Sequence, residues 1–503
     1  MFAFASCSVL GVQVKSVDAA WLLSSDMKAR IFAEENRKWL TLAAVSFGLF
    51  MIMLDNTVVN VALPSIQRDL GTDLSELQWI VTGYALTFAA LMLVGGKVAD
   101  AYGRRLVFVI GIVVFTIASL FCGLADSGET LIAARVLQGV GAALMNPATL
   151  SIIAATFPPH QRGTAIGIWA GVSALALAIG PLAGGLITDH LDWSWIFFVN
   201  VPVGILGVLA SFLLIDESRD ETHVRLDLPG LVTSAVGLFA LTYGLIEANT
   251  YGWGSARILG SFVLAAVTLV AFVVLERRQR DPMLPLELFR SGTYAGANLV
   301  VLLVALAMFG VFFFVSLYMQ NVLGYSAVQA GAAFLPMTIL IILVAPIAGK
   351  TSDHIGSRGL MTAGMILIAV QLVLFSRLTA DASFWNLLPA LLIGGAGMAL
   401  TMTPSAAAAT RSVPVDKAGV GSAVLNSARQ VGGTMGVAII GAIVAAEAGG
   451  ERTVDAFMRG FESALLVAAG IATVGAIVAF TLVRPHEGAG ERRVGPAAPE
   501  PLA

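Results

Sequence analysis

The chain has 503 residues, of which 57% are hydrophobic and only 12% are charged, and its formal net charge is −3. Because soluble domains carry about 25% charged residues, this composition indicates that lipid is the solvent of the fold. The two cysteines, Cys7 and Cys122, exclude a disulfide framework and a cysteine-rich metal site.

Fourteen apolar segments follow one another along the chain. A helix rises ~1.5 Å per residue, so ~20 apolar residues cross ~30 Å of hydrocarbon. The segments are continuous and do not alternate, which favours helices over the strands of a membrane barrel. We therefore expect an all-α polytopic membrane protein. The predicted spans are 39–63, 78–96, 106–125, 130–156, 163–188, 194–215, 229–248, 256–275, 294–320, 327–349, 359–377, 384–408, 417–446 and 461–483.

The longest polar connections, 216–227 and 276–291, bracket the seventh and eighth spans and divide the helices six, two and six. We predict five parts on this basis. They are a cytoplasmic amino-terminal segment 1–38, a six-helix bundle 39–215, two inserted linker helices 229–275, a second six-helix bundle 294–483 and a cytoplasmic tail 484–503. The stretch before Gln13 is apolar but too short to span and makes a poor signal peptide, and Met27 is a second possible start.

Basic residues are distributed unevenly between the two sides. With this span order, 22 of the 29 Lys and Arg fall on the side of the amino terminus, and five fall on the other side. The positive-inside rule then places both termini in the cytoplasm. We expect the protein in the inner (plasma) membrane.

The loop between the second and third spans recurs between the tenth and eleventh. Gly96, Lys97, Asp100, Gly103 and Arg105 reappear at the same spacings as Gly349, Lys350, Asp353, Gly356 and Arg358. Such a repeat predicts two parallel halves, an architecture of transporters. The basic residues alone have an ordinary explanation as positive-inside anchors. Asp100, however, can cap a helix or pair with Arg105, so we favour a contact that is made and broken.

Asp55 is the only carboxylate well inside the first six spans, and Arg135 lies inside the fourth at a similar depth. Lipid disfavours the ionised carboxylate while a nearby Arg favours it, so the two together predict a protonation switch. The alternative is a static pair that only fixes helix packing. Arg135, Gln138 and Asn146 share one polar face, which either serves function or binds helices together.

Three further features of the spans are informative. Gly180, Pro181, Gly184 and Gly185 bend the fifth span and allow close approach, although small residues also serve ordinary packing. Arg429 in the thirteenth span either balances substrate charge or snorkels to the cytoplasm. We expect the substrate cavity to include Asn56, Gln138, Asn146, Phe312 and Arg429. No metal-ligand spacing joins any two of the five His residues.

The Gly96–Arg105 loop resembles the signature of the major facilitator superfamily, with Ala101 in place of the usual Arg. In that family the loop latches the two halves together on the cytoplasmic side. The resemblance therefore implies a conformational latch formed by Gly96, Asp100, Gly103, Arg104, Arg105, Asp353 and Arg358. The run Arg135–Gly141 resembles a fourth-span motif linked to proton transfer. Gly180–Gly185 resembles the antiporter motif, although Ala176 replaces its first Gly. Leu54–Pro64 resembles the first span of fourteen-span drug:proton antiporters, the EmrB/QacA-like branch.

The resemblance implies a major facilitator fold and proton-coupled export of hydrophobic or cationic drug-like molecules. We expect no enzyme activity, no cofactor beyond the proton gradient, no nucleic-acid partner, and a monomer in the lipid bilayer. Three alternatives stay open: a dedicated exporter of one metabolite or antibiotic, an importer, and a transporter-like sensor or scaffold. A membrane-embedded enzyme ranks last because the spans hold no paired catalytic groups.

Overall fold

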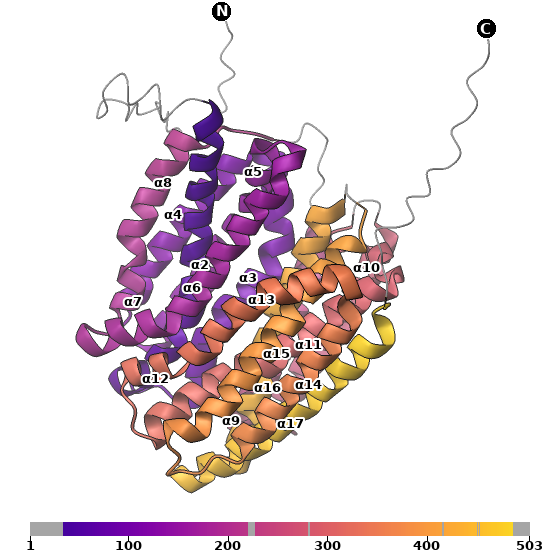
Figure 1. Ribbon diagram of the computed structural model, residues 1–503. Coiled ribbons are helices and arrows are strands. Elements are labelled where there is room, and N and C mark those ends of the chain that lie inside the picture. Colours follow the sequence, from indigo (N-terminus) through magenta and orange to yellow (C-terminus); the bar gives the residue numbers. More distant parts are fainter. Residues whose placement is uncertain are drawn as a thin grey trace, which may run out of the picture.

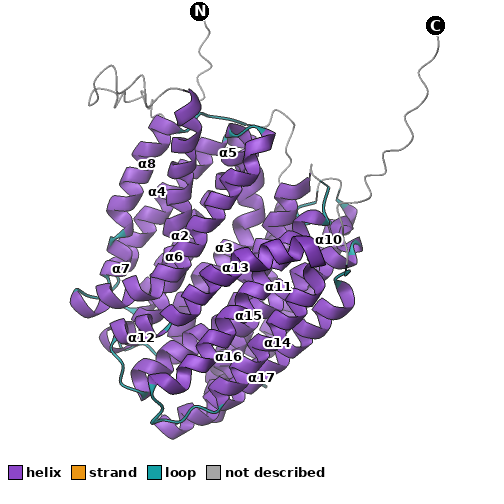
Figure 2. Ribbon diagram, viewed as in Figure 1, coloured by secondary structure: helices purple, strands orange, loops and turns teal. Residues whose placement is uncertain are grey.

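The computed structural model describes residues 34–219, 227–279, 282–414, 417–449, 451 and 453–485. Within these residues every regular element is a helix, and 14 helical segments are long and apolar enough to cross a membrane (Figure 2). The predicted all-α class and span number are therefore confirmed. Most of the predicted amino-terminal segment, both possible start residues and nearly all of the predicted tail lie outside the described residues.

The first half of the chain supplies six crossings and the inserted pair supplies two. Their helices are α2 (Glu34–Leu70), α3 (Leu74–Tyr102), α4 (Arg104–Gly123), α5 (Gly128–Thr156), α6 (Pro159–His190), α7 (Trp195–Phe198) with α8 (Asn200–Leu214), and then α9 (Leu228–Tyr251) and α10 (Ala256–Arg278).

The second half begins after a short 3-10 turn, η2 (Leu286–Arg290), and supplies the other six crossings. Its helices are α11 (Gly292–Leu317) with the π turn η3 (Tyr318–Val322), α12 (Ala327–Ala333) with α13 (Leu335–Ile355), α14 (Ser357–Ser376), α15 (Phe384–Arg411), α16 (Ala418–Ala448) and α17 (Val454–Leu482).

The two halves lie side by side, with indigo-to-magenta helices in one group and orange-to-yellow helices in the other (Figure 1). Successive crossings are joined by short loops and run antiparallel, so each loop belongs to one of two faces. We call the face where α2 begins the near face, and the face where α2 ends the far face. The near face carries both copies of the repeated loop.

Helix ends follow the local chemistry of the sequence. Asp73 and Glu76 form a capping box at the start of α3, since each side chain accepts a hydrogen bond from the other's backbone amide. Gly103 (φ 120°) and Gly356 (φ 84°) separate α3 from α4 and α13 from α14. Both glycines have the positive φ that other residues avoid, so the two repeated loops share one backbone solution.

Several spans differ in their bounds from the prediction. The first span was expected to end at residue 63, but α2 continues through Pro64 to Leu70. A proline inside a membrane helix is tolerated when another group satisfies the carbonyl four residues earlier. That carbonyl belongs to Asn60, and it accepts a hydrogen bond from Ser316 Oγ at 2.9 Å. The sixth, ninth and tenth spans each contain a short extra element, which the continuous apolar runs did not reveal.

Glycines bring neighbouring helices into direct backbone contact. A Cβ atom on Gly141 of α5 would lie 2.6 Å from the Phe115 backbone nitrogen of α4. The corresponding pair in the second half is α14 and α15, where a Cβ on Gly397 would lie 2.9 Å from the Gly364 carbonyl oxygen. Close packing of this kind holds membrane helices together, because lipid provides no hydrophobic drive between them.

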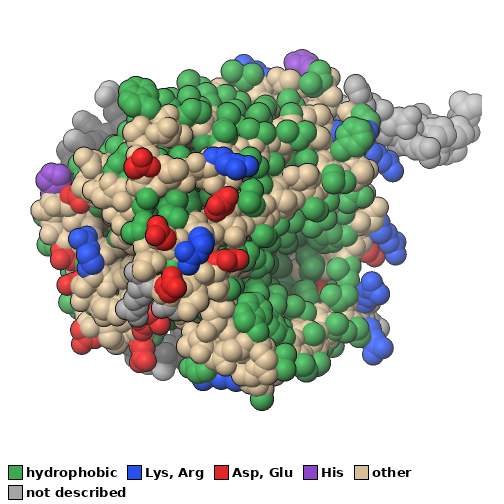
Figure 3. Space-filling model, turned by 90° about the horizontal axis from the view of Figure 1, so that it is seen from below, with side chains coloured by type: hydrophobic (Ala, Val, Ile, Leu, Met, Phe, Trp, Pro, Cys, Tyr) green, Lys and Arg blue, Asp and Glu red, His purple; other side chains and the backbone are tan. Residues whose placement is uncertain are grey.

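The outside of the molecule matches a lipid environment. Figure 3 views the molecule from below, toward the far face, where acidic and basic side chains lie among hydrophobic and other side chains. On α10, Val263, Val267 and Val270 are all largely exposed. The inserted helix α10 therefore presents an apolar surface outward.

The close contact at Gly141 yields a stability prediction. Gly141→Ala should lower the thermal unfolding temperature in detergent, because overpacking of this kind costs about 1–3 kcal/mol. Gly167→Ala is the matched control, since a Cβ at Gly167 meets no atom within 4 Å. Equal unfolding temperatures for the two variants would contradict the packing described here.

Candidate functional site

A buried ion pair lies inside the first half. Arg135 Nη1 of α5 is 2.5 Å from Asp55 Oδ2 of α2. Asp55 is 3% exposed and Arg135 only 1% exposed. The two residues therefore do share one layer, as their depths in the sequence led us to expect, although they lie 80 positions apart.

Gln138 completes the pair one helical turn along α5. Its Oε1 accepts from Arg135 Nη1 at 2.6 Å, and its Nε2 donates to Asp55 Oδ1 at 2.9 Å and to Ser119 Oγ at 2.8 Å. Arg135 Nε donates to the Ile80 carbonyl of α3 at 3.1 Å. The network thus joins α2, α3, α4 and α5 in a single polar layer.

Two aromatic rings enclose the guanidinium group. Its central carbon lies 4.2 Å from the centre of the Tyr84 ring and 5.7 Å from that of Phe197. Cation–π contacts of this kind gain strength where water is excluded. Arg135 is therefore held as a cation by ring faces, a carboxylate, an amide and a backbone carbonyl.

Both carboxylate oxygens of Asp55 accept hydrogen bonds, one from the Arg135 guanidinium and one from the Gln138 amide. A proton on Asp55 would replace an acceptor by a donor and leave the buried Arg135 without its counter-charge. Removing one partner from a buried pair typically costs about 3–5 kcal/mol. Loss of either charge from this layer would thus destabilise this conformation.

The other residues predicted for the cavity each have local contacts in the structure. Asn56 is half-buried and donates to the Ile52 carbonyl of its own helix. Asn146 is 4% exposed. Phe312 packs against Phe334, with ring centres 5.5 Å apart. Arg429 is partly buried, and its Nε has no hydrogen-bond partner among the described residues.

The glycine-rich turn of α6 packs on both halves. A Cβ on Gly180 would lie 1.8 Å from Thr57 Oγ1, and one on Gly184 would lie 2.8 Å from the Val58 carbonyl oxygen, both in α2. A Cβ on Gly185 would lie 2.5 Å from the Ala327 carbonyl oxygen of α12. The Pro181 carbonyl in turn faces Gly331 of α12. The predicted motif therefore lies at a seam between the two halves.

Hydrogen bonds between the halves gather toward the far face. Gln320 Nε2 of the π turn η3 donates to the Val61 carbonyl of α2 at 2.9 Å. Gln78 Nε2 of α3 donates to the Val437 carbonyl of α16 at 2.8 Å. The Asp189 carboxylate at the end of α6 accepts from the first two amides of α12, at 3.1 and 2.9 Å. In the described residues the halves are thus joined directly at the far face.

The repeated loops of the near face form their ion pairs within their own halves. Asp100 pairs with Arg104 at 2.8 Å and not with Arg105, whose Nη1 donates to the Ile215 carbonyl. The expected Asp100–Arg105 pair is therefore wrong for this conformation. An aspartate and an arginine four positions apart meet on one helical face, which is why Arg104 is the partner.

The second loop departs from the first in its partners. Asp353 pairs with Arg411 at the end of α15, at 2.7 Å. Arg358 stacks over the Phe480 ring at 4.0 Å. Gly96 and Gly349 occupy corresponding positions, since added Cβ atoms would lie 3.4 Å from Pro147 and from Thr403. The repeat thus conserves the turn but not the ion pair.

Sequence reasoning missed several polar residues with clear structural roles. Glu217 accepts from the Arg105 and Leu106 amides and so caps α4. Asp189 and Gln78 join the halves. A carboxylate at the very end of a span signals a cap, but the helix that it caps cannot be identified without the tertiary fold.

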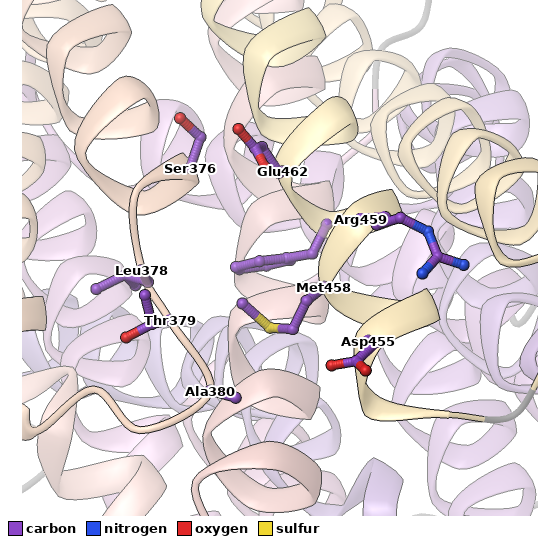
Figure 4. A pocket seen from close by; sticks show the side chains of 9 residues that line it. Ser376, Leu378, Thr379, Ala380, Asp455, Met458, Arg459 and Glu462 are labelled. Atoms are coloured by element: carbon purple, nitrogen blue, oxygen red, sulfur yellow. The ribbon is translucent and has the colours of Figure 1, made fainter.

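The cavity in Figure 4 does not belong to the site around Asp55 and Arg135. It has a volume of about 340 Å³ and lies between the end of α14 and the start of α17, with Asp455, Arg459 and Glu462 among its lining residues. All of its lining residues belong to the second half. It is therefore not a space between the two halves.

Comparison with known proteins identifies the family. The model of the Major Facilitator Superfamily matches residues 45–437, so the chain belongs to this superfamily of transporters. The superfamily predicted from the repeated loop and the span motifs is confirmed.

Named relatives place the chain within the superfamily. It is 40% identical to a puromycin resistance protein of Streptomyces alboniger, over 92% of this chain and 95% of that protein. It is 37% identical to a tetracenomycin C resistance and export protein of Streptomyces glaucescens, over 82% and 77%. It is 37% identical to the multidrug resistance protein Stp of Mycobacterium tuberculosis, over 81% and 76%.

A solved structure has the same fold. It is a bacterial homologue of the human lysosomal transporter Spinster in an inward-facing, unoccupied conformation. The TM-score is 0.62 with 18% identity, covering 89% of this chain and 97% of that one. The likeness supports the major facilitator architecture of two six-helix bundles.

The buried pair yields a second prediction. Arg135→Met should lower the free energy of unfolding by about 3–5 kcal/mol, because it strands the Asp55 carboxylate in an apolar layer. Asp55→Leu combined with Arg135→Met should recover much of that loss. Thermal unfolding in detergent measures both. A double variant less stable than Arg135→Met alone would contradict the coupling.

Proposed function

We propose that this protein is a proton-coupled exporter of drug-like hydrophobic or cationic molecules, working by alternating access. The observation that carries the proposal is the buried Asp55–Arg135 pair, whose charge balance one proton can change. The names of the relatives supply the substrate class, since they are resistance and export proteins for antibiotics or several drugs. No cofactor and no enzymatic step enter this proposal; the energy source is the proton gradient.

The distribution of basic residues supports an orientation. The near face carries most of the Lys and Arg, so we assign it to the cytoplasm and both termini with it. The far face is then external. The halves of this conformation are joined at the external side, by Asp189 among others. We accordingly interpret the structure as a state that favours access from the cytoplasm.

The proposed transport cycle follows from the Asp55–Arg135 ion pair. With Asp55 ionised and bound to Arg135, the external side stays closed and a substrate enters from the cytoplasm or inner leaflet. A proton that enters from outside then neutralises Asp55 and strands the guanidinium, which shifts the equilibrium between the two access states and promotes release of the substrate outside. Release outside and return of the proton to the cytoplasm restore the pair.

The remaining site residues receive roles in the same scheme. Gly180, Pro181, Gly184 and Gly185 form the part of α6 that packs between α2 and α12, so they allow the external side to close tightly. The loops at Asp100 and Asp353 would latch the cytoplasmic side in the opposite state. Partners are a small molecule, protons and lipid, and the working unit is a monomer.

A narrower substrate range is the second candidate function. Two of the relatives carry the name of a single antibiotic, while another is named for multidrug resistance. The chain is slightly more similar to the first of these. A dedicated exporter of one antibiotic would use the same proton cycle with a more selective cavity.

Efflux from proteoliposomes under an imposed pH gradient tests the proposal. The unmodified protein should transport a fluorescent cationic drug across the vesicle membrane only while the pH gradient persists. Asp55→Asn should reduce gradient-driven transport by at least about tenfold, because the buried carboxylate that takes up the proton is lost. Glu129→Gln is the matched control, since Glu129 is an exposed carboxylate in the first turn of α5.

Reconstituted amounts of folded protein must be equal, which gel filtration before reconstitution establishes. Transport by the parent that persists after the gradient collapses would refute proton coupling. A panel of drugs including puromycin in the same assay separates a broad range from a narrow one.

A further inference from the structure

The inserted helix α9 lies against both halves of the transporter. It packs on α3 of the first half and on α16 of the second half, with α10 on its outer side. The two helices that it covers form one of the seams of the far face, where Gln78 of α3 bonds to the Val437 carbonyl of α16. α9 therefore lies along the outside of the closed seam.

Its contact with the first half depends on one carboxylate. Glu247, in the last turns of α9, accepts from Ser75 Oγ at 2.9 Å and from Trp79 Nε1 at 3.0 Å, both in the first turns of α3. The Trp79 ring also lies 6.4 Å from the Tyr243 ring of α9. This end of α9 is thus fixed to the first half by polar and aromatic contacts.

Its contact with the second half comes from the same helical turn. Asn249 Nδ2 donates to the Ala442 carbonyl of α16 at 2.8 Å. The Asn249 Oδ1 accepts from Trp253 Nε1 at 3.0 Å, which orients the amide group. Two residues that are two positions apart on α9 therefore hold opposite halves.

We propose that α9 is a brace that holds the two halves together at the far face, through Glu247 on one side and Asn249 on the other. If the halves separate there, α9 cannot keep both contacts and must release one of them. The inserted pair thus favours the conformation closed at the far face. This inference rests on the alternating-access cycle proposed above and assigns a role to helices that the two-bundle scheme does not need.

A brace predicts a specific pattern of non-additivity. Breaking either end removes the link that α9 makes between the halves, so breaking the second end has no further effect on that link. Contacts that merely dock α9 would instead contribute independently. The single variants Glu247→Ala and Asn249→Ala and their combination distinguish these cases. Thr250→Ala is the matched control, because Thr250 is an exposed residue at the same end of α9 and takes no part in either contact.

Hydrogen–deuterium exchange on the purified full chain measures separation directly, in peptides from the start of α3 and the end of α16. Each single variant should accelerate exchange there by about threefold to tenfold, the factor expected when one hydrogen-bonded contact is lost. The double variant should match the faster single variant, and Thr250→Ala should match the parent.

Two results would overturn the brace: a double variant whose acceleration equals the product of the two singles, or single variants that exchange at the parent's rate. Thermal unfolding run in parallel shows that each variant is folded. Exchange in detergent needs no pH gradient, so failure of proton coupling in proteoliposomes would refute the proposed function and leave this test unaffected.

Discussion

The fold is organised around a carboxylate and a guanidinium held together where water is excluded. Asp55 and Arg135 are almost fully buried, and their nearest polar neighbour, Gln138, contacts both. Such a pair is costly to bury and costly to break, so its presence is weak evidence for stability alone. In the proposed cycle, its value is that the same geometry has two different free energies, depending on one proton.

The contacts between the halves show how a local change can become a global one. α6 contacts α2 through Gly184 and α12 through Gly185, so the helix that packs on the ion-pair helix also packs on the other half. Backbone contacts of this closeness do not deform gradually; they are either made or lost. The seam α6–α12 and the seam α3–α16, with α9 outside it, therefore respond as units. The ion pairs of the near-face loops lie within single halves, although Lys97 donates to the Pro282 carbonyl in the connection before the second half.

Much of this architecture could be predicted from the sequence, because lipid imposes strict rules. Continuous apolar runs fix the number of spans, and the repeat at Gly103 and Gly356 fixes the two halves. The Asp55–Arg135 contact could be expected from depth alone, since few other charges lie inside the spans. The ion-pair partners of residues at helix ends could not be predicted from the sequence. Asp100 and Asp353 have the same spacing in sequence but different partners, because α15 supplies Arg411 to only one of them.

The clearest measurement is the number of protons exchanged with solvent when a drug binds. Calorimetric titration of a cationic drug into the purified protein, in buffers with different ionisation enthalpies, gives that number without any transport. We predict that binding to the parent is linked to proton movement, and that Asp55→Asn binds with none. The same proton count in the parent and in Asp55→Asn would contradict the central claim that this carboxyl couples protons to drug.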